Sequence, residues 1–266
     1  MIEICPLASG SNGNCYYIGN QHDAVLVDAG ISTRQLMLRF KSAGLDPAKV
    51  KAIFITHEHS DHTRGMEVLS KKLGVNVYMT SRTYYALPPA FRPHYVKFFT
   101  PGEAVPVGSF LVHTLLKNHD AVEPCSFRIE HNGRNVGVFT DIGEACSNVT
   151  DAVKQCHALF LETNYDEDML RNGSYPWYLK NRVASSKGHL SNFQAFQLVQ
   201  DHAHPGLECI FLSHISKENN TPEQATSLFT GIDPAIRVKL TSRYAAGEVY
   251  HMSVENSVSK SGSERR

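Results

Sequence analysis

Short apolar segments separated by glycines and polar residues make up the first third of the chain. They predict strands over residues 1–7, 15–18 and 24–27, followed by a helix over residues 34–43 that Ser32 or Thr33 can cap. The first two strands are joined by the polar run Ser9-Gly10-Ser11-Asn12-Gly13-Asn14. We interpret this run as a tight hairpin turn, because it lacks the lysine and the following helix of a phosphate-binding loop.

A continuous apolar run over residues 52–56 predicts a strand that is buried on both faces. It leads directly into His57-Glu58-His59-Ser60-Asp61-His62, and a helix is expected over residues 63–73. The histidine-rich run therefore lies on a loop at the carboxyl end of a strand. Active sites favour such loops, because a rigid scaffold fixes them while their side chains reach solvent.

The pattern in the rest of the chain roughly repeats that of the first part. Further strands are expected at 95–99, 110–116, 125–130, 135–140, 158–162 and 209–213, with helices at 145–156 and 192–202. This order predicts an α/β fold in which two mixed sheets pack back to back with helices on their outer faces. We predict one domain over residues 1–252. Residues 253–266 are rich in Ser, Lys and Arg without an apolar pattern, which predicts a disordered tail.

Composition excludes a strong bulk attraction for nucleic acid. The 266 residues include 26 Lys plus Arg and 26 Asp plus Glu, so a nucleic-acid partner would need a local basic surface. We see neither a signal peptide nor an apolar run long enough to span a membrane, and therefore expect a cytoplasmic protein with no membrane partner. The 6 scattered cysteines are expected to be reduced. The oligomeric state stays open.

The spacing of the histidine-rich run is typical of metal ligands. His57 and His59 project to the same side of an extended segment and can hold one ion, while Asp61 and His62 can face a second. Imidazole and carboxylate together suit zinc, with manganese or iron as alternatives. Three other candidate ligands each follow a run of buried residues: His119, Asp141 and His214.

With these residues the chain resembles the metallo-β-lactamase superfamily, and the resemblance implies a four-layer αββα sandwich. It also implies that His57, His59 and His119 hold one metal ion and that Asp61, His62 and His214 hold another. Asp141 would bridge the two ions, and Asp28 would orient the loop that carries the motif. Two divalent metal ions are the cofactors that this resemblance implies.

Further motifs resemble those of the YycJ (WalJ) branch, single-domain relatives of the ribonuclease Z and ribonuclease J nucleases. They are the openings at 9–14 and 26–30, and the segments 119–121, 140–143, 188–192 and 212–214. The resemblance implies a DNA exonuclease, and two ions roughly 3.5–4 Å apart suit phosphodiester hydrolysis.

Four residues are expected to act on the substrate or its neighbours. Asp61 would also hold the attacking water, and His189 would donate a proton to the leaving group. Glu162 would orient His189, while Ser191, which caps the following helix, would help to hold a phosphate. A purely structural role for His189 at the entry of that helix is the alternative.

Basic residues mixed with aromatic ones suggest where a nucleic-acid strand would lie. Two segments have this composition, residues 82–97 and 175–187. A solvated surface is the alternative interpretation of both. Two other functions stay open, namely a hydrolase of a small cyclic phosphodiester, lactone or thioester, and a regulatory protein with structural metals. The last is disfavoured because aspartate ligands in an open site are unusual for structural zinc.

Overall fold

The computed structural model describes residues 1–254, and its strands form two seven-stranded sheets. The first sheet has the order β14-β1-β2-β3-β4-β5-β6. Its strands are β1 (Ile2–Ala8), β2 (Cys15–Gly19), β3 (Ala24–Val27), β4 (Val50–Phe54), β5 (Asn76–Met79), β6 (Val96–Phe98) and β14 (Tyr250–Met252). The second sheet has the order β13-β12-β11-β10-β9-β8-β7. Its strands are β7 (Ala104–Val107), β8 (Phe110–Leu116), β9 (Cys125–His131), β10 (Arg134–Phe139), β11 (Ala158–Glu162), β12 (Cys209–Ser213) and β13 (Arg237–Leu240).

The two sheets have matching topology. In the first, β14, β1, β2 and β3 pair antiparallel, and β3, β4, β5 and β6 pair parallel. In the second, β7, β8, β9 and β10 pair antiparallel, and β10, β11, β12 and β13 pair parallel. Both sheets are therefore mixed, as the repeating sequence pattern predicts.

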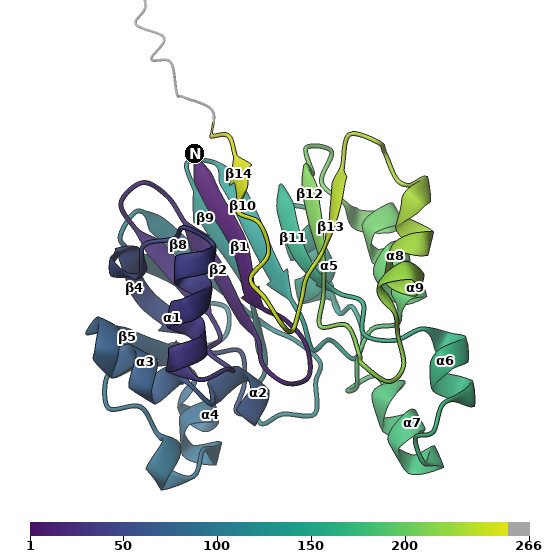
Figure 1. Ribbon diagram of the computed structural model, residues 1–266, viewed down its shortest axis with the longest axis horizontal. Helices are drawn as coiled ribbons and strands as arrows, with labels where there is room; N and C mark the ends of the chain where they lie inside the picture. The colour runs from purple at the N-terminus through teal and green to yellow at the C-terminus, as the bar shows by residue number, and fades with distance from the viewer. Residues whose placement is uncertain (255–266) are drawn as a thin grey trace, which may run out of the picture.

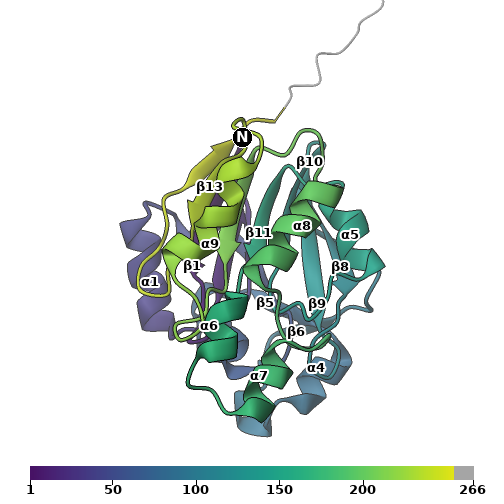
Figure 2. The same ribbon diagram turned by 90° about the vertical axis from the view of Figure 1, so that its right-hand side faces the viewer.

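Helices cover the outer face of each sheet, which completes four layers (Figure 1). On the first half of the chain these are α1 (Thr33–Ser42), η1 (Pro47–Lys49), α2 (Ser60–Thr63), α3 (Met66–Leu73), α4 (Ser81–Ala86) and η2 (Pro89–Phe91). On the second half they are α5 (Ser147–Val153), α6 (Glu167–Asn172), α7 (Trp177–Val183), α8 (Asn192–His202), α9 (Pro222–Ser227) and η3 (Leu228–Gly231). Figure 2 shows α5, α8 and α9 lying over the second sheet.

Three apolar clusters hold these layers together. The central one packs one sheet against the other and contains large, fully buried rings of Phe54, Phe127 and Phe160. A second cluster lies between the first sheet and α1 and α3, and a third between the second sheet and α5, α8 and α9. Apolar burial of this extent supplies the rigid frame on which the strand-end loops rest.

Two predicted helices differ from those observed. The helix expected over residues 63–73 begins later, at Met66, as α3, and the separate short α2 precedes it. Between them the Gly65 amide donates to the Ala29 carbonyl at 2.7 Å and not to a carbonyl of the preceding turn. The helix expected over 145–156 is confined to Ser147–Val153. Several short elements were not predicted, namely β5, β7, β13, β14, α4, α6, α7 and α9.

The predicted tail begins at residue 253, so nearly all of it lies outside the described residues, and the single-domain boundary stays a prediction. The six cysteines are free thiols, as expected, and all but Cys146 are buried. Within residues 1–254, no helix has the length and apolar character required to cross a membrane.

Candidate metal centre

The predicted ligands converge where strands of both sheets end. Asp28 follows β3, the histidine-rich loop follows β4, Asp141 follows β10, and His214 follows β12. Asp28, Asp141 and His214 have left-handed backbone conformations, with φ of 62°, 55° and 55°. Such conformations are uncommon for residues other than glycine, and they turn the chain sharply at the end of each strand.

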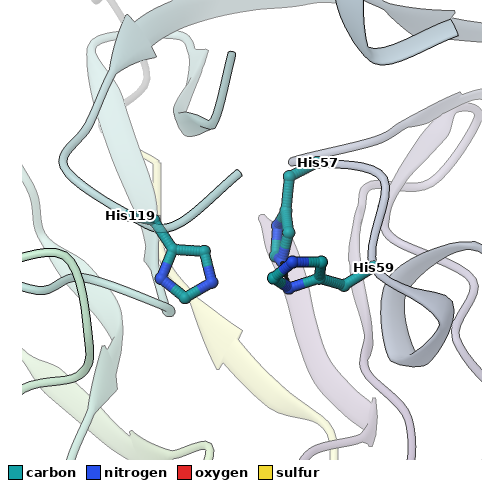
Figure 3. A group of neighbouring side chains, drawn as sticks. All are labelled: His57, His59 and His119. Carbon is teal, nitrogen blue, oxygen red and sulfur yellow. Dashed lines mark hydrogen bonds between the residues drawn. The ribbon is translucent and has the colours of Figure 1, made fainter. Parts of the chain in front are cut away.

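One group of ligands consists of His57, His59 and His119, whose rings point toward one another from opposite loops (Figure 3). The Nε2 atom of His57 lies 3.0 Å from Nδ1 of His59, and the His57 and His119 ring centroids are 4.9 Å apart. Each buried ring is oriented through its other nitrogen: His57 Nδ1 lies 2.9 Å from Thr56 Oγ1, and His119 Nδ1 lies 3.1 Å from the Gly188 carbonyl. The remaining nitrogens of this group therefore face a common point.

A second group consists of Asp61, His62 and His214, and it is linked to the first through Asp141. Asp141 Oδ2 lies 3.3 Å from His62 Nε2, and Asp141 Oδ1 lies 3.5 Å from His214 Nε2 and 4.0 Å from His119 Nε2. The structure thus brings all seven predicted ligands together, with the Asp141 carboxylate between the two groups.

Asp28 fixes the ring of His62. Its Oδ2 accepts a hydrogen bond from His62 Nδ1 at 2.7 Å, and its Oδ1 accepts one from the Thr56 amide at 2.9 Å. Both Asp28 and His62 are completely buried, so this contact leaves only Nε2 of His62 free to bind a metal. The predicted contribution of Asp28 to the motif loop agrees with this geometry.

Glu162 connects two histidines with the backbone after Asp141. Its Oε1 lies 2.8 Å from His189 Nδ1 and 3.1 Å from His214 Nδ1. Its Oε2 accepts hydrogen bonds from the amides of Ile142, at 2.7 Å, and Leu190, at 3.2 Å. Glu162 was expected to orient His189, and its contact with His214 was not foreseen.

The histidines of the two groups differ in electrostatic surroundings. Burial lowers the pKa of His119 to about 4 despite the nearby Asp141 carboxylate, and burial with repulsion from His62 lowers the pKa of His57. Burial opposes protonation of His214 too, but Asp141, Asp61 and Glu162 raise its pKa to about 10. Asp141 and Asp28 likewise raise the pKa of His62 above its ordinary value. The surrounding carboxylates therefore favour the protonated forms of His62 and His214.

The carboxylates of the centre show the complementary shifts. Burial would raise their pKa values, but the facing imidazolium rings outweigh it. His62 and His214 lower the pKa of Asp61 and of Asp141, and His189 with His214 lowers the pKa of Glu162 to about 2. All three carboxylates are ionised at neutral pH and able to bind cations.

Three buried polar atoms in the centre have no hydrogen-bond partner among the described residues: His119 Nε2, Asp141 Oδ2 and His214 Nε2. Buried groups left without partners are costly, by roughly 1–3 kcal/mol each. All three are atoms of a kind that can bind a metal, and they belong to residues of the candidate ligand groups. The donor set therefore fits bound divalent cations, with imidazole and carboxylate in the proportions that zinc or manganese accepts.

Some residues around the centre could not be recognised from local sequence. The Asn14 side-chain nitrogen lies 3.2 Å from His62 Nε2, although this residue was interpreted only as part of a hairpin turn. Lys117, which is 3% exposed, donates a hydrogen bond to the Thr140 carbonyl at 2.6 Å and adds a buried positive charge. The polar character of residues 9–14 between two apolar strands was the available signal for Asn14.

Ser191 caps α8, as the sequence predicts. Its side chain is completely buried, its oxygen accepts a hydrogen bond from the Gln194 amide, and its hydroxyl contacts Glu167 Oε1 at 3.0 Å. These contacts form the amino-terminal cap of α8. The hydroxyl is consequently engaged within the fold, and the contact with a substrate phosphate stays a prediction.

A cavity of about 160 Å³ adjoins the centre, and His189 forms part of its wall. Asn164, Ser216 and Asn219 provide polar groups in its lining, and Leu179 with Val183 of α7 provides apolar ones. Arg182 is also part of the lining, but it pairs with Asp120 at 2.5 Å. The cavity is therefore polar and close to neutral.

Comparison with known proteins identifies relatives over most of the chain. A family model described as the metallo-beta-lactamase superfamily matches residues 8–176. The chain is 36% identical over 227 residues to the exodeoxyribonuclease YycJ of Bacillus anthracis, covering 84% of this chain and 86% of that protein. It is 34% identical to the exodeoxyribonuclease WalJ of Streptococcus pneumoniae, covering 82% of this chain and 83% of that protein. The crystal structure of the metallo-beta-lactamase fold protein YhfI from Bacillus subtilis superposes with a TM-score of 0.70 at 15% identity, covering 93% of this chain and 100% of that one.

Proposed function

Since the chain belongs to the metallo-beta-lactamase superfamily and is a metal-dependent hydrolase, we propose that it uses two metal ions to hydrolyse DNA phosphodiester bonds as an exonuclease. The family match confirms the resemblance noted in the sequence motifs, and the named activity of the YycJ and WalJ relatives supports a nuclease.

The observation that carries the two-metal proposal is the pair of ligand groups joined by Asp141. His57, His59 and His119 form one group, and the other lies on the opposite side of the shared carboxylate. Divalent cations bound by such groups supply two effects, acidification of a water molecule and neutralisation of the charge that develops on a phosphoryl group. A purely structural site has no need of an aspartate placed between two ligand groups.

The protein's own residues would control orientation and proton transfer. Asp61 Oδ2 lies 3.4 Å from His62 Nε2, which leaves the carboxylate at the edge of its ligand group and able to accept a hydrogen bond from the attacking water. His189 is held through Nδ1 by Glu162, so its Nε2 is available to protonate the leaving oxygen. Glu162 would stabilise the positive charge on His189 before that proton is transferred.

The substrate would reach the centre between two surfaces rich in exposed aromatic residues. On α7, Trp177 and Tyr178 are 76% and 74% exposed, and near α4, Tyr85 and Phe91 are 66% and 63% exposed. Both helices lie at the same end of the molecule as α2, which carries Asp61 and His62 of the metal motif (Figure 1). Exposed rings next to lysines and arginines suit stacking of bases and pairing with phosphates, and the cavity beside His189 is of a size for one nucleotide fragment.

The decisive experiment incubates purified protein, with manganese or zinc, on end-labelled duplex DNA, single-stranded DNA and RNA bearing a 5′-phosphate or a 5′-hydroxyl. Asp61→Ala is compared with Asp151→Ala, a surface aspartate paired with Lys154 on α5. We expect DNA to be shortened from an end, a loss of more than about a hundredfold in Asp61→Ala, and no loss in Asp151→Ala.

Two outcomes would contradict this proposal. Equal cleavage by Asp61→Ala would identify the activity as a contaminant. Failure to cleave any polymer, together with turnover of bis(p-nitrophenyl) phosphate, would instead favour the hydrolase of small molecules that the sequence leaves open.

A further inference from the structure

The polar hairpin between β1 and β2 contacts residues of the metal centre, although it has no role in the proposed reaction. Asn14 is completely buried. Its backbone amide donates to the Asp61 carbonyl at 2.8 Å, and its backbone carbonyl accepts from the Gly30 amide at 2.8 Å. A Cβ on Gly30 would lie 1.6 Å from the Asp61 carbonyl oxygen, so this contact requires glycine. The hairpin therefore packs directly against the backbone of a predicted ligand.

The orientation of the Asn14 side chain follows from the two groups that donate hydrogen bonds to it. Its Oδ1 accepts hydrogen bonds from the Gly10 amide at 2.9 Å and from the Tyr16 hydroxyl at 3.2 Å. Only an oxygen can accept both, so Nδ2 must point the other way. There it lies 3.5 Å from the Asp61 carboxylate and 3.2 Å from His62 Nε2. The amide consequently presents its hydrogens to the side of the centre that holds Asp61.

The Tyr16 hydroxyl extends this series of hydrogen bonds to the opposite sheet. Tyr16 gives its only hydroxyl proton to Asn14, so the Ser9 hydroxyl must donate to Tyr16, over 2.9 Å. Ser9 Oγ in turn accepts the backbone amide of His214 at 2.8 Å. The direction of donation is therefore fixed from the His214 amide through Ser9 and Tyr16 to Asn14 Oδ1, and Asn14 Nδ2 faces Asp61 and His62. Ser9, Tyr16 and Asn14 are all buried, with exposures of 4%, 0% and 0%.

The two ends of this relay lie on ligands of one group that come from different sheets. Asp61 follows β4 of the first sheet, and His214 follows β12 of the second. Their facing atoms, Asp61 Oδ2 and His214 Nε2, are 3.7 Å apart. Glu162 orients the His214 ring but does not contact Asp61, whereas the relay touches both ligands.

We propose that Ser9, Tyr16 and Asn14 form a positioning relay that sets the separation of Asp61 and His214, and so controls the affinity of this group for its metal ion without affecting the ion held by His57, His59 and His119. The relay acts through the ligands and does not contact the substrate. It explains why Ser9 and Asn14 of this polar hairpin are buried.

The test compares Tyr16→Phe with Tyr17→Phe. The two tyrosines are neighbours on β2, and both are fully buried. The Tyr17 hydroxyl, however, contacts Glu3 Oε2 at 3.3 Å, and Glu3 is not a residue of the metal centre. Each substitution removes one hydroxyl only. Metal-free protein is titrated with zinc and, separately, manganese against a chromogenic chelator, which gives an affinity for each ion, and unfolding temperature and kcat are measured on the same samples.

We expect Tyr16→Phe to lower the affinity for one of the two ions by about 10–100-fold and to leave the affinity for the other unchanged. The kcat of this variant should fall, and excess metal should restore it. Tyr17→Phe should match the wild type in both affinities. Asn14→Asp, which replaces the donor with a carboxylate facing Asp61, should lower the affinity for the same ion further.

If the affinities for both ions fall equally, or if the unfolding temperature falls while both affinities are unchanged, the relay proposal is wrong and the hairpin is purely structural. Binding of one ion only by the wild type would overturn both this inference and the two-metal proposal. The relay is also wrong if Tyr17→Phe reproduces the effect of Tyr16→Phe.

Discussion

Metal binding should release about two protons from one ligand group and few from the other. In the metal-free protein, His214 has a pKa of about 10, and the pKa of His62 is also raised, because both face ionised carboxylates. An imidazole must be neutral to bind a metal, so both protons leave when an ion enters their group near pH 8. His57 and His119, whose pKa values are lowered, are already neutral. The expected release is therefore about two protons for one ion, and none from His57 or His119 for the other.

This release has a measurable size. With two protons lost, the apparent affinity for that ion should rise about a hundredfold per pH unit between roughly pH 7 and 9. Calorimetric titration in two buffers of different ionisation enthalpy gives the proton count directly. His214→Gln should lower that count to about one. A count near zero, or an affinity independent of pH, would refute the assignment of cationic His62 and His214.

The same shifts determine how the stability of the metal-free protein depends on pH. The pKa of His214 is higher in the folded protein than the unfolded value of about 6.5. Its contribution to stability is thus complete below about pH 6.5 and is lost as the pH rises through about 10. Metal-free protein should unfold at a lower temperature at pH 9 than at pH 6.5, and saturation with metal should remove this difference, as differential scanning fluorimetry can measure.

Three substitutions test other contacts of the site. Glu162→Gln removes the charge that His189 and His214 face, so kcat should fall roughly 10–100-fold in steady-state assays at saturating metal. Asp28→Asn replaces one of the two carboxylate oxygens that accept hydrogen bonds from His62 and Thr56 with an amide nitrogen, which cannot accept, so chelator competition should show metal affinity reduced by roughly 10–100-fold. Trp177→Ala should raise KM for DNA about tenfold through lost base stacking while hydrolysis of bis(p-nitrophenyl) phosphate is unchanged. Phe193→Ala, which removes another exposed ring, is the control and should not alter KM.

The ligands were predictable because each follows an apolar strand. Residues 52–56 and 209–213 are continuous apolar runs, and each ends at a histidine, His57 or His214. The two strands lie in different sheets, but their carboxyl ends meet, since the His62 and His214 ring centroids are 6.0 Å apart. The strands with strong patterns were accordingly placed to within a few residues.

The missed features depend on contacts between distant parts of the chain. The short α6 and α7 carry too few residues for a helical apolar pattern, and α7 exposes its aromatic side chains. The Gly65 amide, just before α3, donates to the Ala29 carbonyl, which is remote in sequence. Ser9 and Asn14 have ordinary turn composition, and only folding brings them against His214 and Asp61. A sequence pattern carries no direct signal of such partners.

The left-handed residues show why the geometry of the centre belongs to the fold. Of the four described non-glycine residues with positive φ, Asp28, Asp141 and His214 lie in the centre, and the other, Asn132, lies in the turn between β9 and β10. This conformation costs roughly 1–2 kcal/mol for each residue. Each of the three turns is held from elsewhere in the chain: the Asp28 amide donates to Phe54, the His214 amide donates to Ser9, and the amide after Asp141 donates to Glu162. These bonds do not involve the metal-binding atoms, so the fold itself holds the strained turns in place, and packing of the two sheets must offset their cost.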